Sequence, residues 1–91
     1  MEYEVVFSDK VFDEDLPRIP VANKAQITKA IDGRLKTNPL QLGKALTSDL
    51  KGFRRLRVGD FRIVYKVEGR QVTIVIIDFR KSVYQRLLSR I

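Results

Sequence analysis

Apolar and polar residues alternate along residues 53–67, and this period of two predicts a pair of adjacent β-strands. Gly59 and Asp60 separate the two runs and are residue types that a two-residue hairpin turn favours. Counting outward from this turn sets the register of the hairpin. The predicted cross-strand pairs are Val58 with Phe61, Arg57 with Arg62, Leu56 with Ile63 and Arg55 with Val64.

The two faces of this predicted hairpin differ in chemistry, because successive side chains of a strand point to opposite sides. The apolar face carries Leu56, Val58, Phe61, Ile63 and Tyr65. The other face, here called the basic face, carries Arg55, Arg57, Arg62 and Lys66. Like charges directly opposite one another weaken a sheet, and the hairpin places no acid on this face. We therefore expect the basic face to bind an anion.

Helical periodicity appears on both sides of the hairpin in the sequence. Ile27, Ile31 and Leu35 recur at four-residue spacing and predict a helix over residues 20–37, which Asn38-Pro39 ends. Two shorter helices are predicted, one between Ser8 and Pro17 and one over residues 82–91.

Two further strands complete the prediction, at residues 3–7 and 72–77, and residues 39–50 read as a surface loop. The run at 72–77 is so apolar that we expect both of its faces to be covered. The length of the turn before it is open by one residue. Because a slip of one residue reverses the faces of a strand, the pattern leaves the orientation of Asp78 and Arg80 undecided.

These elements predict an α+β fold with the order β-α-α-β-β-β-α in one small domain, residues 1–91. The simplest arrangement is an antiparallel sheet packed on a helical hairpin, with a short C-terminal helix. The helices would cover the apolar face of the hairpin. The basic face would then be open to solvent.

Composition narrows the chemistry that such a domain can perform. The chain contains no Cys and no His, which removes disulfides, thiolate nucleophiles and the commonest metal ligands. No apolar stretch reaches the length of a membrane span and no signal peptide is evident, so we expect a cytoplasmic protein without membrane contacts. Residues 1–32 carry a net charge of −3 and residues 33–91 a net charge of +10. Such a basic half favours phosphate-bearing partners, above all nucleic acid.

Two segments of the basic half, residues 50–65 and 77–84, resemble the signature of the RelE/ParE toxin superfamily of bacterial and archaeal toxin-antitoxin pairs. The first contains the run Arg-Val-Gly-Asp-Phe-Arg-Ile-Val-Tyr. The likeness spans the whole chain, since the predicted elements follow the order of that superfamily. RelE-type members cut messenger RNA on the ribosome, whereas ParE-type members inhibit DNA gyrase on the same fold.

For RelE-like enzymes, the resemblance implies that Arg62 contacts the scissile phosphate and that Arg55 supplies a second cation. Arg80 corresponds to a late arginine of the family, and Tyr84 to the tyrosine of its Val-Tyr pair. All four positions are filled, which favours the RelE-like branch. Many relatives have His immediately before the late arginine, where this chain has Phe79.

RNA brings its own nucleophile, because the 2′-hydroxyl can attack the adjacent phosphate without a metal, another cofactor or a protein nucleophile. Guanidinium groups can bind the non-bridging oxygens and stabilise the charge of the transition state. Without His, the candidates for proton transfer are Tyr84, Lys51 and Asp78. The predicted catalytic set is Arg62, Arg55, Arg80, Tyr84 and Lys51.

The remaining candidates, predicted to bind RNA or phosphate, are Arg57, Lys66, Phe53 and Lys81. Cations of this kind are more often solvated than functional, and an aromatic ring is more often packed than free. Phe53 nevertheless falls on the cationic side of the sheet, where a ring can stack on an unpaired base. Tyr84 has the same two interpretations, packing and function.

The resemblance also implies partners, namely a cognate antitoxin, the ribosome and messenger RNA. An acidic antitoxin segment that folds on binding would suit the basic half, and a heterotetramer with the antitoxin is one compatible assembly. The alternative is a non-enzymatic binding module, either a ParE-like gyrase inhibitor or a degenerate toxin that retains antitoxin binding.

Overall fold

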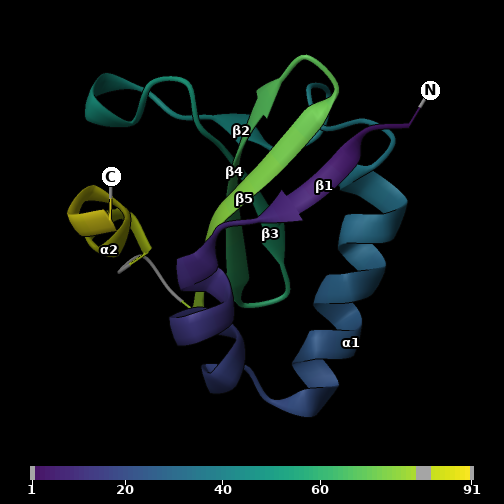
Figure 1. Cartoon of the computed structure of the whole chain (residues 1–91), viewed down its shortest axis with the longest axis vertical. Coiled ribbons are helices and arrows are strands. Elements are labelled where there is room, and N and C mark those ends of the chain that lie inside the picture. Colours follow the sequence, from purple (N-terminus) through teal and green to yellow (C-terminus); the bar gives the residue numbers. More distant parts are fainter. Residues whose placement is uncertain (1, 80–82, 91) are drawn as a thin grey trace.

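The computed structural model describes residues 2–79 and 83–90, which form a five-stranded mixed sheet with helical segments on both faces (Figure 1). The strand order is β1-β5-β4-β3-β2. The strands are β1 (Glu4–Phe7), β2 (Lys44–Ala45), β3 (Arg54–Val58), β4 (Phe61–Glu68) and β5 (Gln71–Phe79). The helical segments are η1 (Val11–Asp15), η2 (Leu16–Arg18), α1 (Val21–Ala30), η3 (Ile31–Leu35), η4 (Ser48–Leu50) and α2 (Val83–Arg90). The predicted α+β class and the order of the main elements are confirmed.

The central hairpin has the register that its turn predicts. Arg57 lies opposite Arg62 and Arg55 lies opposite Val64 in the β3–β4 pair. Gly59 adopts a φ of +60°, a left-handed conformation that glycine reaches without steric cost. A two-residue turn therefore fixes which side chains share a face.

Two features of the sheet differ from the prediction. β1 runs parallel to β5, with Glu4 opposite Gln71 and Phe7 opposite Ile74, so the sheet is mixed and not antiparallel throughout. No short turn joins these strands, and the residue pattern of an edge strand does not encode its direction. The predicted loop at 39–50 also contains β2, which is too short to show an alternation.

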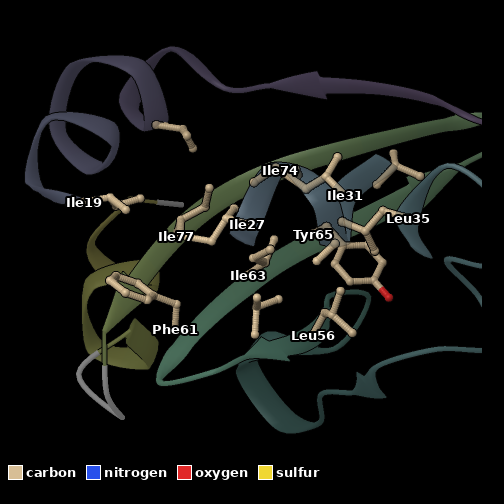
Figure 2. Packing of buried hydrophobic residues seen from close by; sticks show 14 residues of the cluster. Ile19, Ile27, Ile31, Leu35, Leu56, Phe61, Ile63, Tyr65, Ile74 and Ile77 are labelled. Carbon is tan, nitrogen blue, oxygen red and sulfur yellow. The ribbon is translucent and has the colours of Figure 1, made fainter. Parts of the chain in front are cut away.

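The apolar face of the hairpin packs against α1 and η3 in the main core (Figure 2). The helical side contributes Ile27, Ile31 and Leu35, the residues that predicted this helix from their spacing. The sheet contributes Leu56, Val58, Phe61, Ile63, Tyr65, Val72, Ile74 and Ile77. Burial of each large aliphatic or aromatic side chain contributes about 1.5–3 kcal/mol, so this contact holds the helices on the sheet.

A second core lies on the opposite side of the sheet, beneath α2. Val64 and Ile76 pack there against Val83 and Leu87, and all four side chains are fully buried. A register shift in the β4–β5 pairing at Val64/Tyr65 brings Ile76 opposite Val64. The prediction that this side is open to solvent is therefore wrong in part, because Val64 and Ile76 give it an apolar centre that α2 covers.

Gly43 lets the loop before β2 approach the sheet closely. Its φ is +76°, and a Cβ there would lie 2.6 Å from the Arg55 carbonyl oxygen and 2.8 Å from the Tyr65 hydroxyl. We expect Gly43→Ala to lower the free energy of unfolding by about 1–3 kcal/mol in urea denaturation. Gly33→Ala is the control, because a Cβ at Gly33 meets no atom within 4 Å, and its helical position predicts a gain of up to about 1 kcal/mol. Equal effects of both substitutions would contradict this account.

Candidate active site

Arg55 and Arg62 lie close together on the basic face. Arg55 is paired across the strands with Val64, and Arg62 precedes Val64 by two residues on β4. Such diagonal neighbours have their backbones about 7–8 Å apart, within reach of long side chains. Both arginines are half-buried. The sheet therefore holds two guanidinium groups beside the edge of the second core.

Tyr84 joins this pair from α2. The Arg55 guanidinium donates a hydrogen bond of 2.7 Å to the Tyr84 hydroxyl oxygen. Because that oxygen accepts from Arg55, the phenolic proton is free to be donated to another group. The structure thus joins Tyr84 to Arg55, and Arg62 is the diagonal neighbour of Arg55 on the same face of the sheet.

Arg62 keeps its charge uncompensated within the described residues. No ion pair or hydrogen bond connects its guanidinium to residues 2–79 or 83–90, and its buried Nε lacks an acceptor there, as does the Nε of Arg55. An unpaired buried donor costs about 1–3 kcal/mol. An anion at the exposed edge of these guanidiniums would offset part of that cost.

Asp78 lies directly opposite Arg62 in the β4–β5 pair, which resolves the orientation that the sequence left open. Its Oδ2 accepts a hydrogen bond of 2.6 Å from Arg86, and its Oδ1 accepts one of 2.7 Å from the Phe79 amide. Both carboxylate oxygens are therefore occupied. This geometry argues against Asp78 as a proton-transfer group.

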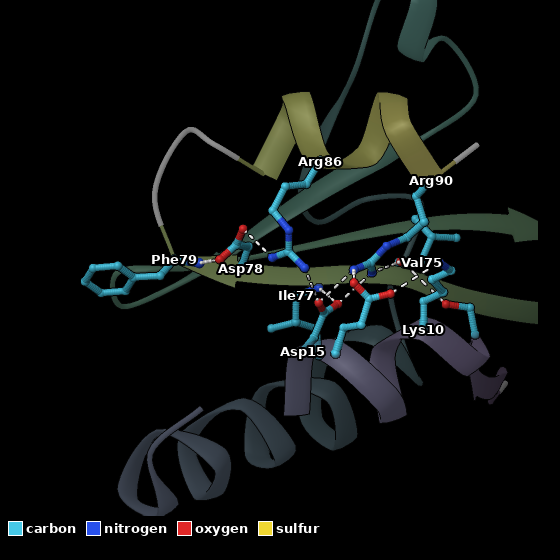
Figure 3. A network of polar contacts seen from close by, with 10 residues as sticks. Lys10, Asp15, Val75, Ile77, Asp78, Phe79, Arg86 and Arg90 are labelled. Carbon is cyan, nitrogen blue, oxygen red and sulfur yellow. Dashed lines mark hydrogen bonds and ion pairs between the residues drawn. The ribbon is translucent and has the colours of Figure 1, made fainter. Parts of the chain in front are cut away.

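Asp15 forms the centre of a buried ionic network beside this site (Figure 3). Its carboxylate accepts hydrogen bonds from the Ile77 amide at 2.9 Å, from Arg86 at 2.9 Å and from Arg90 at 2.8 and 2.9 Å. Sequence reasoning missed this network. One feature of the sequence could have indicated it. Asp15 lies four residues from Val11 and four from Ile19, so an acid falls on the buried apolar stripe of the helical segment.

Electrostatics keep this network ionised. Burial disfavours the Asp15 carboxylate, but hydrogen bonds from Arg90, the Ile77 amide and Arg86, together with the charge of Arg90, hold its pKa below the usual value. Desolvation of Arg86 is likewise outweighed by Asp78 and Asp15, which raise its pKa. The network therefore fixes α2 on β5 with charged partners.

The Tyr65 side chain belongs to the main core and not to the basic face. Its hydroxyl donates to the Pro39 carbonyl at 2.7 Å and lies 3.0 Å from the Leu42 carbonyl. Burial raises the pKa of Tyr65, and the nearby Arg54 opposes that rise in part. This phenol anchors the loop before β2.

The other predicted candidates are more dispersed. Lys51 is exposed in the turn after η4. Lys66 lies four residues beyond Arg62 on β4, about 13 Å along the strand, and pairs with Glu68 at 3.4 Å. Phe53 is partly buried against the second core, as is Tyr84. Arg80 and Lys81 lie outside the described residues.

Arg57 is exposed at the edge of the sheet and borders a hollow of about 500 Å³ between α1, η3 and the hairpin turn. Lys29 and Arg34 line the same hollow. No described acid lines it, so it gathers three cations at the edge of the sheet, on the side that α1 and η3 cover.

Residues 2–79 and 83–90 contain no cluster of three acidic, His or Cys side chains that could hold a metal ion. Within the same residues, no helix has the length and apolar character needed to cross a membrane.

Comparison with known proteins identifies the class to which this fold and site belong. Residues 5–83 match the family described as ParE toxin of type II toxin-antitoxin system, parDE. Because the match covers most of the chain, the protein belongs to this toxin family, within the RelE/ParE superfamily that the sequence signature predicted.

Individual relatives place it beside RelE toxins. It is similar to Toxin RelG of Mycobacterium tuberculosis, with 32% identity over 88 residues that cover 94% of this chain and 100% of the relative. Toxin RelE of the same organism is 37% identical over 73 residues, 78% of this chain and 75% of the relative. The crystal structure of the RelBE2 toxin-antitoxin complex from M. tuberculosis matches with a TM-score of 0.82 at 29% identity, covering 88% of this chain and 100% of that one. The chain is thus a RelE-family toxin of a type II toxin-antitoxin system.

Proposed function

We propose that this toxin is a metal-independent endoribonuclease that cuts messenger RNA on the ribosome, with the RNA 2′-hydroxyl as nucleophile. The observation that carries the proposal is the cluster of Arg55, Arg62 and Tyr84. It combines two arginines that are diagonal neighbours on the sheet, one of them unpaired within the described residues, with a hydroxyl held at 2.7 Å from Arg55. The likeness to RelE toxins supports the same activity.

In the proposed reaction, the 2′-oxygen attacks the adjacent phosphorus and the bond to the 5′-oxygen breaks. The products are a 2′,3′-cyclic phosphate and a 5′-hydroxyl. Arg62 and Arg55 bind the non-bridging oxygens and stabilise the negative charge that grows in the transition state. We assign Arg80 to the same task on the basis of the family resemblance.

Two protons must move in this reaction, one from the 2′-hydroxyl and one to the leaving 5′-oxygen. Tyr84 is the best placed described group, because its hydroxyl oxygen is fixed by Arg55 and its proton is free to be donated. Lys51 is the second candidate and would act from its exposed turn.

The cations around the site are proposed to attract the RNA and to bind its phosphates as it approaches. Arg57 and the two cations of its hollow, Lys29 and Arg34, offer phosphate contacts at the sheet edge. Lys66 and Lys81 would extend this attraction, and Phe53 could turn one face of its ring toward an unpaired base.

An antitoxin is the proposed protein partner, since the structurally similar RelBE2 toxin was crystallised as a toxin-antitoxin complex. An acidic segment that folds on the basic half would satisfy the uncompensated charge of Arg62 and Arg57. Equal amounts of both proteins in a heterotetramer are one arrangement to test by light scattering.

The second candidate function is gyrase inhibition, which the match to the ParE family model favours. One experiment separates the two. The purified toxin is added to a reconstituted translation system and to a gyrase supercoiling assay, and transcript 5′ ends are mapped. Cuts that follow codon position and require ribosomes support the nuclease. Intact transcripts with lost supercoiling would replace it with gyrase inhibition.

Tyr84→Phe tests the proposed proton transfer. The substitution keeps the ring in the second core but removes the hydroxyl, so we expect single-turnover cleavage to slow by about 10²-fold or more while ribosome binding is unchanged. The measurement is a quench-flow time course at saturating ribosomes. Unchanged rates would remove Tyr84 from the mechanism and direct attention to Lys51.

A further inference from the structure

Arg62 and Asp78 are opposite charges that face each other across β4 and β5 without forming an ion pair. Such cross-strand partners have their Cβ atoms about 4.5–5.5 Å apart and normally attract. Asp78 instead binds Arg86 of α2, with 2.6 Å between the Arg86 guanidinium and Asp78 Oδ2. The carboxylate is thereby directed to α2, as Figure 3 shows.

Arg86 is itself held in place. A second nitrogen of its guanidinium donates to Asp15 Oδ1 at 2.9 Å, and the Ile77 amide fixes the other Asp15 oxygen at 2.9 Å. Arg86 therefore bridges two carboxylates from different parts of the fold. The buried carboxylate of Asp15 therefore fixes the position of Arg86, and Arg86 in turn fixes the position of Asp78.

An arginine paired with a carboxylate binds phosphate poorly, because the pair must first break and the carboxylate repels the phosphate. We propose that Arg86 is a positioning residue that withdraws Asp78 from Arg62 and so keeps the Arg62 guanidinium available to an anion. This inference rests on the proposed function only for the identity of that anion, an RNA phosphate.

The experiment compares cleavage by Arg86→Gln, Asp78→Asn and the double variant in the reconstituted translation system. Arg86→Gln releases Asp78 toward Arg62, and we expect cleavage to fall at least about fivefold. The double variant removes the competing carboxylate, and its rate should return to within about threefold of Asp78→Asn. A merely structural role of Arg86 predicts no such rescue.

Arg90→Gln is the matched control. Arg90 also donates to both oxygens of Asp15 from α2, but it makes no contact with Asp78. This variant should lose stability while retaining cleavage at temperatures below its unfolding transition. If Arg90→Gln loses cleavage as Arg86→Gln does, or if the double variant is no better than Arg86→Gln, the proposal is wrong.

A direct readout requires no RNA. The ¹⁵N–¹H signal of the Arg62 Nε in NMR spectra reports whether this guanidinium is ion-paired. We expect Arg86→Gln to shift this signal and the added Asp78→Asn change to reverse the shift. Absence of any shift would overturn the positioning role. If the wild type cleaves no RNA, the proposed function fails, and the NMR comparison still decides the inference about Arg62.

Discussion

Arg62→Ala is expected to lower messenger RNA cleavage by about 10²–10³-fold, the loss typical when one group that stabilises transition-state charge is removed. The Arg62 guanidinium is half-buried, and no described residue neutralises it. Its charge is therefore worth more at a bound phosphate than the charge of a solvated cation. Arg62→Lys should recover only part of the rate, because an ammonium group cannot contact two phosphate oxygens in the planar geometry of a guanidinium.

The control for this prediction is Arg70→Ala. Arg70 is exposed in the turn between β4 and β5, so its loss changes the net charge equally but leaves the basic face intact. Cleavage is measured as the single-turnover rate at saturating ribosomes. A similar rate for Arg62→Ala and Arg70→Ala would show that Arg62 contributes only to the overall charge.

Asp15→Ala is expected to be the most destabilising of the substitutions considered. Its side chain is fully buried and binds Arg86, Arg90 and the Ile77 amide. Removing one partner of such a network leaves charges uncompensated and costs about 3–5 kcal/mol of unfolding free energy. That is a large share of the total stability of a small domain. Urea denaturation followed by circular dichroism gives the measurement.

Glu14→Ala provides the comparison from the neighbouring position. Its carboxylate is partly exposed and lies 4.0 Å from Arg90, at the limit of an ion pair. Exposed pairs contribute about 0–1 kcal/mol, so this variant should remain close to the wild type. A loss from Asp15→Ala no larger than that from Glu14→Ala would refute the structural role of the network.

The acid stability of the fold should depend on the same residue. The pKa of Asp15 is lower in the folded than in the unfolded chain. Its carboxylate therefore stabilises the fold above the unfolded pKa of about 3.9, and this contribution is lost as the pH falls through the folded pKa. Unfolding free energies measured below pH 4 should decline more steeply for the wild type than for Asp15→Ala.

Local rules explain which parts of the fold could be predicted from the sequence. The register of β3 and β4 follows from Gly59 and Asp60, because a two-residue turn leaves no freedom in the pairing. The direction of β1 depends on its meeting β5 across most of the chain, and nothing within Glu4–Phe7 specifies it. α2 covers the basic face because it packs on Val64 and Ile76. The prediction of an open face considered only the charged residues of the hairpin and not these two apolar ones.

In the candidate site, too, the local features could be predicted from the sequence and the long-range contacts could not. The resemblance selected Arg55, Arg62 and Tyr84, but their meeting required a helix to be placed on the sheet. Asp78 could not be oriented, because the register shift in the β4–β5 pairing is not visible in an apolar run. The partnership of Asp15 with Arg86 and Arg90 joins residues more than seventy positions apart, beyond any local pattern.

The bonds between Asp15 and Arg90, which span 75 positions, also bear on when the protein can fold during its own synthesis. Domains whose contacts are distant in sequence cannot complete them until the later residues have left the ribosome. The hydrogen bonds between Asp15 of η1 and Arg90 of α2 therefore form only after residue 90 has emerged from the ribosomal exit tunnel.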